Sequence, residues 1–158
     1  MAAFIQLKTR SKADYPFILD YRTRWSDNDM YHHMNNSIYN FLYDSVINTY
    51  LIKHCAFDPQ TSPQYGMVVH SHNDYFGSIS FPAVAELGLR VNQIGNSSVT
   101  YEIALFEKGV ETVRSVGEFI QVFVDRDTAR PNANGMREDL RQGLQRLLVE
   151  QPKRQSKI

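Results

Sequence analysis

The sequence predicts an α+β domain in which a five-stranded antiparallel sheet wraps around one long central helix, followed by a C-terminal helix. The first observation behind this prediction is a change of apolar period, from two over residues 17–25 to three or four over residues 37–56. The second is a return to strand patterns, separated by short turns, over residues 67–125. A long helix that is apolar around most of its circumference needs a curved sheet to cover it.

The chain length and composition indicate a single folded domain. The chain has 158 residues, of which 42% are hydrophobic and 22% are charged, as is usual for a folded domain of this size. We expect the domain over residues 15–150, a flexible N-terminus over residues 1–14 and a disordered tail over residues 151–158. Residues 1–13 contain three basic residues and no acidic one, but they are too short for a clear organellar signal.

The charge balance and the cysteine content limit which partners and which cellular compartment are expected for this chain. Lys plus Arg and Asp plus Glu are balanced at 17 each, which gives no support for nucleic-acid binding. No apolar stretch reaches the ~18 residues that span a bilayer, so we expect no membrane span. The single cysteine, Cys55, excludes an intrachain disulfide and fits a reducing compartment, the cytoplasm or an organellar matrix.

Residues 17–25 are predicted to form the first strand, because apolar and polar side chains alternate along them except at Ile18. A polar loop follows over residues 26–36. Two adjacent apolar stripes then predict a buried helix over residues 37–56, with Asn35 or Asn36 as the N-cap. Pro59 ends this helix.

The remaining strands are expected in one antiparallel meander. Residues 67–76 are mixed in character, residues 83–94 alternate clearly, and residues 95–98 read as a turn before a strand from residue 99. Residues 112–125 are apolar on both faces, as in a central strand. Leucines at helical spacing predict an amphipathic helix over residues 136–149.

Residues 25–39, WSDNDMYHHMNNSIY, resemble the opening motif of the hotdog-fold thioesterases related to 4-hydroxybenzoyl-CoA thioesterase. That motif contains Asp-x-Asp, a short loop often written Gly-His-Val-Asn-Asn, and a Tyr just inside a helix. The matching residues are Asp27, Asp29, His33, Asn35, Asn36 and Tyr39. The order of elements matches through at least residue 125. His32 departs from the family, which often has Gly there, and this leaves the size of the acyl group open.

The resemblance implies a hotdog fold and hydrolysis of an acyl-CoA or acyl-carrier thioester. It implies that Asp29 is the catalytic carboxylate and that the backbone N–H of Asn36 polarises the thioester. It also implies a homodimer or homotetramer in which the Asp29 loop of one subunit faces strand and loop residues of another. We expect no cofactor, with coenzyme A entering only as part of the substrate.

The residues themselves are compatible with that chemistry. Thioester hydrolysis needs a group that activates water or attacks the carbonyl, and donors that hold the oxyanion. A carboxylate before a helix can activate the water or attack the carbonyl. The free N–H groups at the start of the helix can hold the oxyanion. By itself, Asp29 would more often be structural, and the surrounding motif favours catalysis. Candidate substrate-binding residues are His33, Asn35, Asn73 and Ser98.

No metal is expected in the catalytic site. His70 and His72 share one face of a strand and could ligate a metal, but the sequence indicates no third ligand, so an ordinary strand face is favoured. The basic residues Arg90, Lys108, Arg114, Arg126 and Arg130 could each bind the CoA phosphates or simply be solvated.

Two other functions remain open. One is a dehydratase or hydratase acting on an acyl thioester, although its usual pairing of His and Asp on the helix is not evident. The other is a non-catalytic acyl-binding module, which a fold alone does not exclude.

Overall fold

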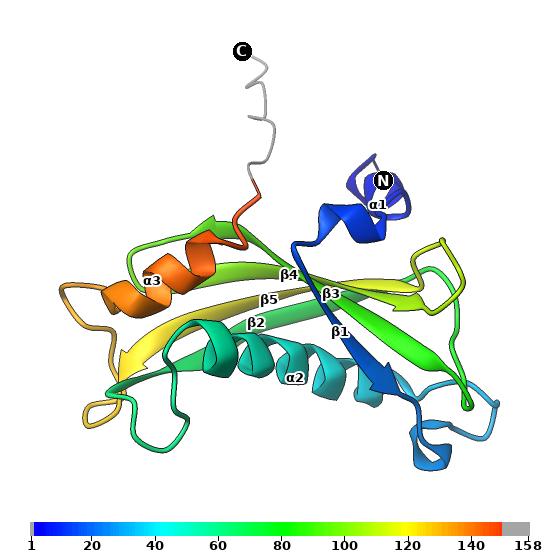
Figure 1. Cartoon of the computed structure of the whole chain (residues 1–158), viewed down its shortest axis with the longest axis horizontal. Helices are drawn as coiled ribbons and strands as arrows, with labels where there is room; N and C mark the ends of the chain where they lie inside the picture. The colour runs from blue at the N-terminus through cyan, green and yellow to red at the C-terminus, as the bar shows by residue number, and fades with distance from the viewer. Residues whose placement is uncertain (1, 150–158) are drawn as a thin grey trace.

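Five antiparallel strands form one sheet in the computed structural model, which describes residues 2–149 (Figure 1). The strands are β1 (Phe17–Arg22), β2 (Gln64–Tyr75), β3 (Val84–Ile94), β4 (Ser98–Glu107) and β5 (Ser115–Asp125). Their spatial order is β1-β3-β4-β5-β2, so β1 and β2 are the two edges. The predicted α+β class and five-stranded sheet are confirmed.

The expected meander of four consecutive strands is wrong at β2. Only β3, β4 and β5 follow one another in space, and β2 pairs with β5 along its whole length. The chain therefore crosses from one side of the sheet to the other between β2 and β3. This crossing segment, residues 76–83, contacts the loop before the long helix, because Met34 N–H donates to the carbonyl of Ile79 at 2.8 Å.

The long helix α2 (Asn36–His54) lies against one face of the sheet (Figure 1). Its sheet-facing side buries Tyr39, Leu42, Tyr43, Val46, Ile47, Tyr50 and Leu51. The buried Tyr43 hydroxyl hydrogen-bonds to Ser115 Oγ at 2.8 Å, which ties the helix to β5. The helix is not buried all round, because Phe41 and Ile52 remain 69% and 49% exposed. The sheet of one chain covers only one side of it.

The N-terminal segment, which we expected to be flexible, has regular structure in part. It forms α1 (Ala2–Leu7) and a 3-10 turn, η1 (Lys12–Asp14), and packs on the face of the sheet opposite α2. Arg10 and Tyr15 both donate hydrogen bonds to the buried carboxylate of Glu102 on β4. Arg90 of β3 also binds Glu102 at 2.9 Å. A buried carboxylate needs such partners, and they hold the segment in place.

The C-terminal helix α3 (Glu138–Gln145) is shorter than the expected span of 136–149. Leu148 leaves the helix to form a parallel bridge with Val91, while Leu140 and Leu144 are fully buried in the main core. The expected tail at 151–158 lies outside the described residues. Within the described part of the chain, no helix is long and apolar enough to cross a membrane.

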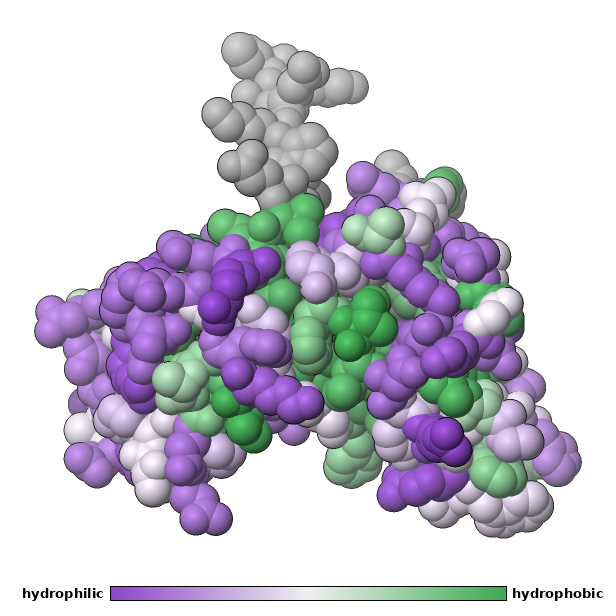
Figure 2. Space-filling view, viewed as in Figure 1, coloured by the Kyte–Doolittle hydropathy of each residue, from purple (hydrophilic) through white to green (hydrophobic). Residues whose placement is uncertain are grey.

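Hydrophobic residues also reach the surface. On the face shown in Figure 2 they gather in the middle of the molecule, beside β1, with polar residues around them. At the other edge of the sheet, three consecutive residues of β2 are more than two-fifths exposed: Met67, Val68 and Val69. Unpaired, apolar strand edges of this kind favour association with another strand.

Candidate active site

The loop before α2 is closed into a small hairpin over residues 27–35. Asn28 and Met34 form an antiparallel bridge, and Asp29 N–H donates to the carbonyl of His33 at 2.8 Å. Asn35 N–H donates to the carbonyl of Asp27, also at 2.8 Å. Met34 is buried in the core and anchors the hairpin. These contacts hold the Asp29 hairpin directly before the start of α2.

Asp29 is half-buried, and one of its carboxylate oxygens shapes the hairpin. Asp29 Oδ1 accepts hydrogen bonds from the backbone N–H of Tyr31 at 2.8 Å and of His33 at 3.3 Å. Oδ2 makes no hydrogen bond to any residue that the structure describes. A carboxylate held through one oxygen and open at the other can accept a proton from a bound water.

Asp27 has a different environment from Asp29. Its side chain is fully buried and accepts hydrogen bonds from Arg24 and from the Tyr21 hydroxyl at 2.9 Å. Burial by itself would raise the pKa of Asp27, but the hydrogen bonds from Arg24 and Tyr21 outweigh it and lower the pKa below its usual value. With its oxygens occupied by these donors, Asp27 is suited to ordering the loop.

The start of α2 leaves one backbone donor free. Asn35 is the N-cap, and its Oδ1 accepts from Ser37 N–H at 3.0 Å and from the Ser37 hydroxyl at 2.7 Å. Ile38 N–H donates to the carbonyl of Asn35 at 2.9 Å. Between the two capped positions, the N–H of Asn36 has no hydrogen-bond partner among residues 2–149. The free donor at this helix terminus is suited to an oxyanion.

His32, which stands where the family motif often has Gly, has a backbone conformation that Gly favours. Its φ of 61° is in the left-handed region, where Gly is favoured because it has no Cβ. The side chain that replaces Gly here is exposed and points out of the core. His33 is exposed as well, and only its backbone contacts Asp29 among the described residues.

Asn73 lies on β2 opposite the first turns of α2. Its Nδ2 donates to Asn40 Oδ1 at 2.9 Å, while its buried Oδ1 has no partner among the described residues. Next to this pair is a shallow cavity of about 350 Å³ between α2 and the edge strand β2. It is lined by Asn40, Phe41, Asp44, Val68, Ser71 and Phe119. The structure therefore brings Asn73 to the same side of the sheet as the helix start.

Ser98 is not brought to Asp29 within one chain. It begins β4, in the tight turn where its carbonyl accepts from Gly95 N–H at 2.8 Å. The Asp29 hairpin contacts the opposite end of the β3–β4 pair, since Phe81 N–H, just before β3, donates to Asn28 Oδ1. A role for Ser98 would need the site of another subunit.

Three of the five basic residues considered for the CoA phosphates make ion pairs. Arg90 binds the buried Glu102, Arg114 binds Glu107, and Lys108 binds Asp20. Arg126 donates to the carbonyls of Ser62 and Pro59. Arg130 is exposed on a loop. These contacts give Arg90 and Arg126 structural roles and select none of the five as a phosphate ligand.

The hairpin and the turn before it also expose large side chains that sequence reasoning did not single out. Trp25, Met30 and Tyr31 are each at least 80% exposed. Their position beside Asp29 was visible in the sequence, but their exposure was not, because apolar residues in a loop are as often buried against the fold. Cys55, in contrast, is buried, and burial raises the pKa of its thiol to about 11, which leaves it a packing residue.

The structure places a candidate third ligand, which the sequence did not indicate, beside His70 and His72. Glu118 on β5 is the register partner of His72, and ligand atoms of the three residues all lie within 4.8 Å of one another. The sequence did not show this because strand pairing between β2 and β5 brings distant residues together.

Comparison with known proteins places this site in a family. Residues 23–144 match the family model of the thioesterase-like superfamily. The crystal structure of the PA5185 protein from Pseudomonas aeruginosa is 41% identical in sequence, with a TM-score of 0.84, over 88% of this chain and 96% of that one.

More distant structures share the fold. A predicted thioesterase from Bacillus stearothermophilus is 19% identical with a TM-score of 0.72, over 86% of this chain and 98% of that one. The SAV2348 protein from Staphylococcus aureus, solved in complex with CoA, is 17% identical with a TM-score of 0.76, over 86% of this chain and 85% of that one. No curated protein matches the sequence. The family match and the match to PA5185 together show that this chain belongs to the thioesterase-like superfamily and has its hotdog fold.

Proposed function

We propose that the protein is an acyl-CoA thioesterase that cleaves its substrate with the Asp29 carboxylate and the backbone N–H of Asn36. The observation that carries the proposal is the free N–H of Asn36 at the start of α2, beside a hairpin that holds a partly open carboxylate. A nucleophile activator and an oxyanion donor next to each other are what thioester hydrolysis requires.

In the proposed reaction, Asp29 accepts a proton from a water molecule as its oxygen attacks the thioester carbon. The carbonyl oxygen becomes an oxyanion and accepts a hydrogen bond from Asn36 N–H. When the tetrahedral intermediate collapses, the carbon–sulfur bond breaks and the departing thiolate takes the proton from Asp29. One water and one thioester thus give one carboxylic acid and one thiol, with Asp29 returned to its starting state.

The cavity along α2 is the proposed place for the acyl group. Its volume of about 350 Å³ is within the usual range for small-molecule sites, and it begins at Asn40, one helical turn from Asn36. Phe41, Val68 and Phe119 supply apolar walls, and the Asn73–Asn40 pair is next to it. A similar fold binds CoA in the Staphylococcus aureus protein, which supports CoA as the thiol carrier here.

The test is hydrolysis of a panel of acyl-CoA and acyl-carrier thioesters, read from the release of free thiol. We expect turnover of at least one acyl-CoA, with thiol and acid formed in equal amounts. A dehydratase or hydratase would instead change the acyl chain and release no thiol, and an acyl-binding module would bind without turnover. Either outcome would contradict the proposal.

We expect this turnover to be independent of metal ions, because the proposed steps use only a carboxylate and a backbone amide. Activity measured after exhaustive chelation and desalting should match that of the untreated protein. Loss of activity that a single divalent ion restores would refute a metal-free catalytic site.

We also propose that the active unit is at least a dimer, with β2 of one chain against β2 of its partner. The support is the unpaired edge of β2, its exposed Met67, Val68 and Val69, and the exposed Phe41 beside them. A two-fold pairing would extend the sheet, bury this edge and close the open side of the cavity. It would also allow residues of one chain to complete the site of the other.

Sedimentation equilibrium at micromolar concentration should give at least twice the 18.3 kDa mass of one chain. Val69→Lys should shift the protein toward monomers and lower its turnover, because a charge on an edge strand opposes pairing. Ile5→Lys, at a residue of nearly equal exposure on α1, is the matched control and should leave the mass unchanged.

A mixing experiment tests the shared site directly. Asp29→Asn and Asn73→Ala chains, each impaired alone, should regain activity when mixed if one site draws on two chains. A monomer with full specific activity would contradict the interface site.

A further inference from the structure

A cluster of potential metal ligands lies on the face of the sheet opposite the candidate active site. Asn73 of β2 contacts Asn40 of α2, and Ser71 lines the cavity beside α2, so these two residues face the helix. Because side chains alternate along a strand, His70 and His72 point to the other face. Both histidines are exposed there.

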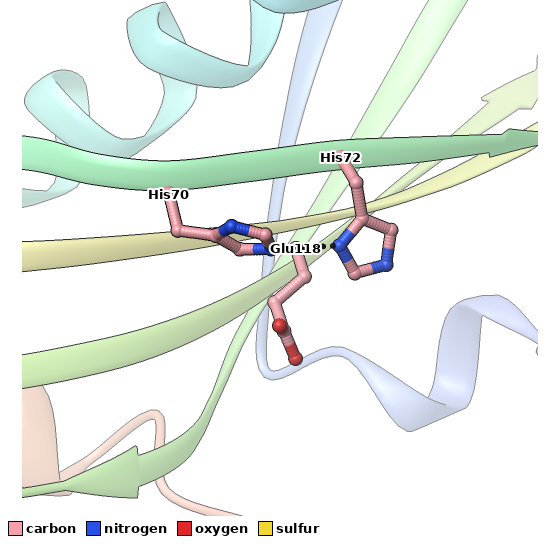
Figure 3. Close-up of side chains that lie close together, drawn as sticks. All are labelled: His70, His72 and Glu118. Atoms are coloured by element: carbon pink, nitrogen blue, oxygen red, sulfur yellow. Dashed lines mark hydrogen bonds between the residues drawn. The ribbon is translucent and has the colours of Figure 1, made fainter.

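Glu118 reaches the same place from the neighbouring strand. It is the register partner of His72, and the adjacent Phe119 packs against Tyr43 of α2, so Glu118 also points away from the helix. Figure 3 shows the two imidazole rings side by side on β2 and Glu118 of β5 between them, with its carboxylate pointing away from the rings.

The two histidines are already spaced as ligands of one ion. His70 Nε2 and His72 Nδ1 are 3.3 Å apart. Two nitrogens bound to one tetrahedral zinc ion at about 2.0–2.1 Å are separated by about 3.3 Å. A carboxylate oxygen of Glu118 lies within 4.8 Å of a ring nitrogen of each histidine. A bulge in β2 between Val68 and His70 sets the direction of the strand just before the pair.

The charged residues around the cluster leave the Glu118 carboxylate available to bind a cation. Its register partner on β4, Glu102, is neutralised by Arg10 and Arg90. Glu118 itself makes no hydrogen bond or ion pair within residues 2–149. A cation bound by the histidines would supply a positive charge opposite the Glu118 carboxylate. The hydrogen bond between the two rings supplies no such charge.

We propose that His70, His72 and Glu118 bind one Zn²⁺ ion per chain, with water as the fourth ligand. Two imidazoles and one carboxylate form a common ligand set for zinc. The ion would join β2, an edge strand, to the neighbouring strand β5 and so stabilise the edge. This site is separate from Asp29 and does not depend on the proposed function.

The test is zinc binding by metal-free, full-length protein, measured by calorimetry and by competition with a chromophoric chelator. We expect one equivalent per chain and a rise in melting temperature on adding Zn²⁺. The visible spectrum with Co²⁺ should show the strong d–d bands of a tetrahedral site. His70→Gln, His72→Gln and Glu118→Gln should each weaken binding at least about tenfold and reduce the thermal shift.

Matched controls separate this site from other surface groups. His54→Gln and Glu111→Gln remove exposed side chains of the same types elsewhere and should leave zinc affinity unchanged. Absence of binding, or equal binding by the His70→Gln/His72→Gln double variant, would overturn the proposal. Half an equivalent per chain would place the ion between two copies and would also overturn a site within one chain.

Discussion

Asp29→Asn is expected to fold normally and to lose at least about 100-fold in kcat, because its amide cannot accept a proton from the attacking water. The fold should survive, since the amide oxygen of Asn can still accept the hydrogen bonds that Tyr31 and His33 donate to Asp29. KM should change little. Steady-state hydrolysis of the best acyl-CoA, with circular dichroism as a check on folding, measures the effect.

Asp58→Asn is the matched control, because Asp58 has the same structural role without the catalytic one. Its Oδ1 accepts hydrogen bonds from Gln60 N–H at 2.7 Å and from Thr61 N–H at 3.3 Å. Asp29 Oδ1 likewise accepts from two backbone N–H groups that follow it, those of Tyr31 and His33. Turnover of this variant should stay near that of the native chain. If Asp29→Asn also retained near-normal turnover, Asp29 would not be the catalytic carboxylate.

Asp27→Asn should give a different result. The buried Asp27 carboxylate holds Arg24 and Tyr21, so its replacement should reduce the free energy of unfolding by about 1.5–3 kcal/mol. Denaturant unfolding would show this loss, which distinguishes a loop-ordering carboxylate from the catalytic one.

Glu102→Ala is expected to have the largest effect on stability, lowering the free energy of unfolding by about 3–5 kcal/mol. Glu102 is 5% exposed, and its carboxylate receives hydrogen bonds from Arg10, Tyr15, Arg90 and Asn92. Removing it leaves the buried Arg90 without its counter-charge. Because a domain is stable by only about 5–15 kcal/mol, the loss should be evident in urea unfolding.

Glu107→Ala provides the comparison on the same strand. Glu107 pairs with Arg114, but both side chains are at least a quarter exposed, so the loss should be below about 1 kcal/mol. An effect of Glu102→Ala no larger than that of Glu107→Ala would show that the N-terminal segment is not held through Glu102.

The same carboxylate predicts a loss of stability in acid. Burial alone would raise the pKa of Glu102, but hydrogen bonds from Arg10 and the charges of Arg90 and Arg10 lower it below its ordinary value of 4.5. A lowered pKa in the folded state means that the stabilisation is complete above pH 4.5 and is lost as pH falls through the lowered pKa. Glu102→Gln should flatten this part of the stability profile.

The sequence alone determined the class of the fold and the position of the candidate carboxylate. Period-two patterns located β1, β3 and β4, a stretch apolar on both faces located β5, and a helical pattern located α2, because these patterns reflect which side chains face the core. The Asp29 motif was visible for a similar reason. A helix start, its cap and the preceding loop are neighbours in the chain, so the resemblance of this one stretch to the thioesterase motif implied roles for Asp29, Asn35 and Asn36 together.

The tertiary structure alone decided which distant segments meet. Pairing of β2 with β5 rather than β3 brings Glu118 to His70 and His72, and no local pattern encodes that choice of neighbour. The order of the N-terminal segment likewise depends on Glu102, far along the chain on β4. Local periodicity tells which face of an element is apolar, but the partner of that face is chosen by the packing of the whole chain.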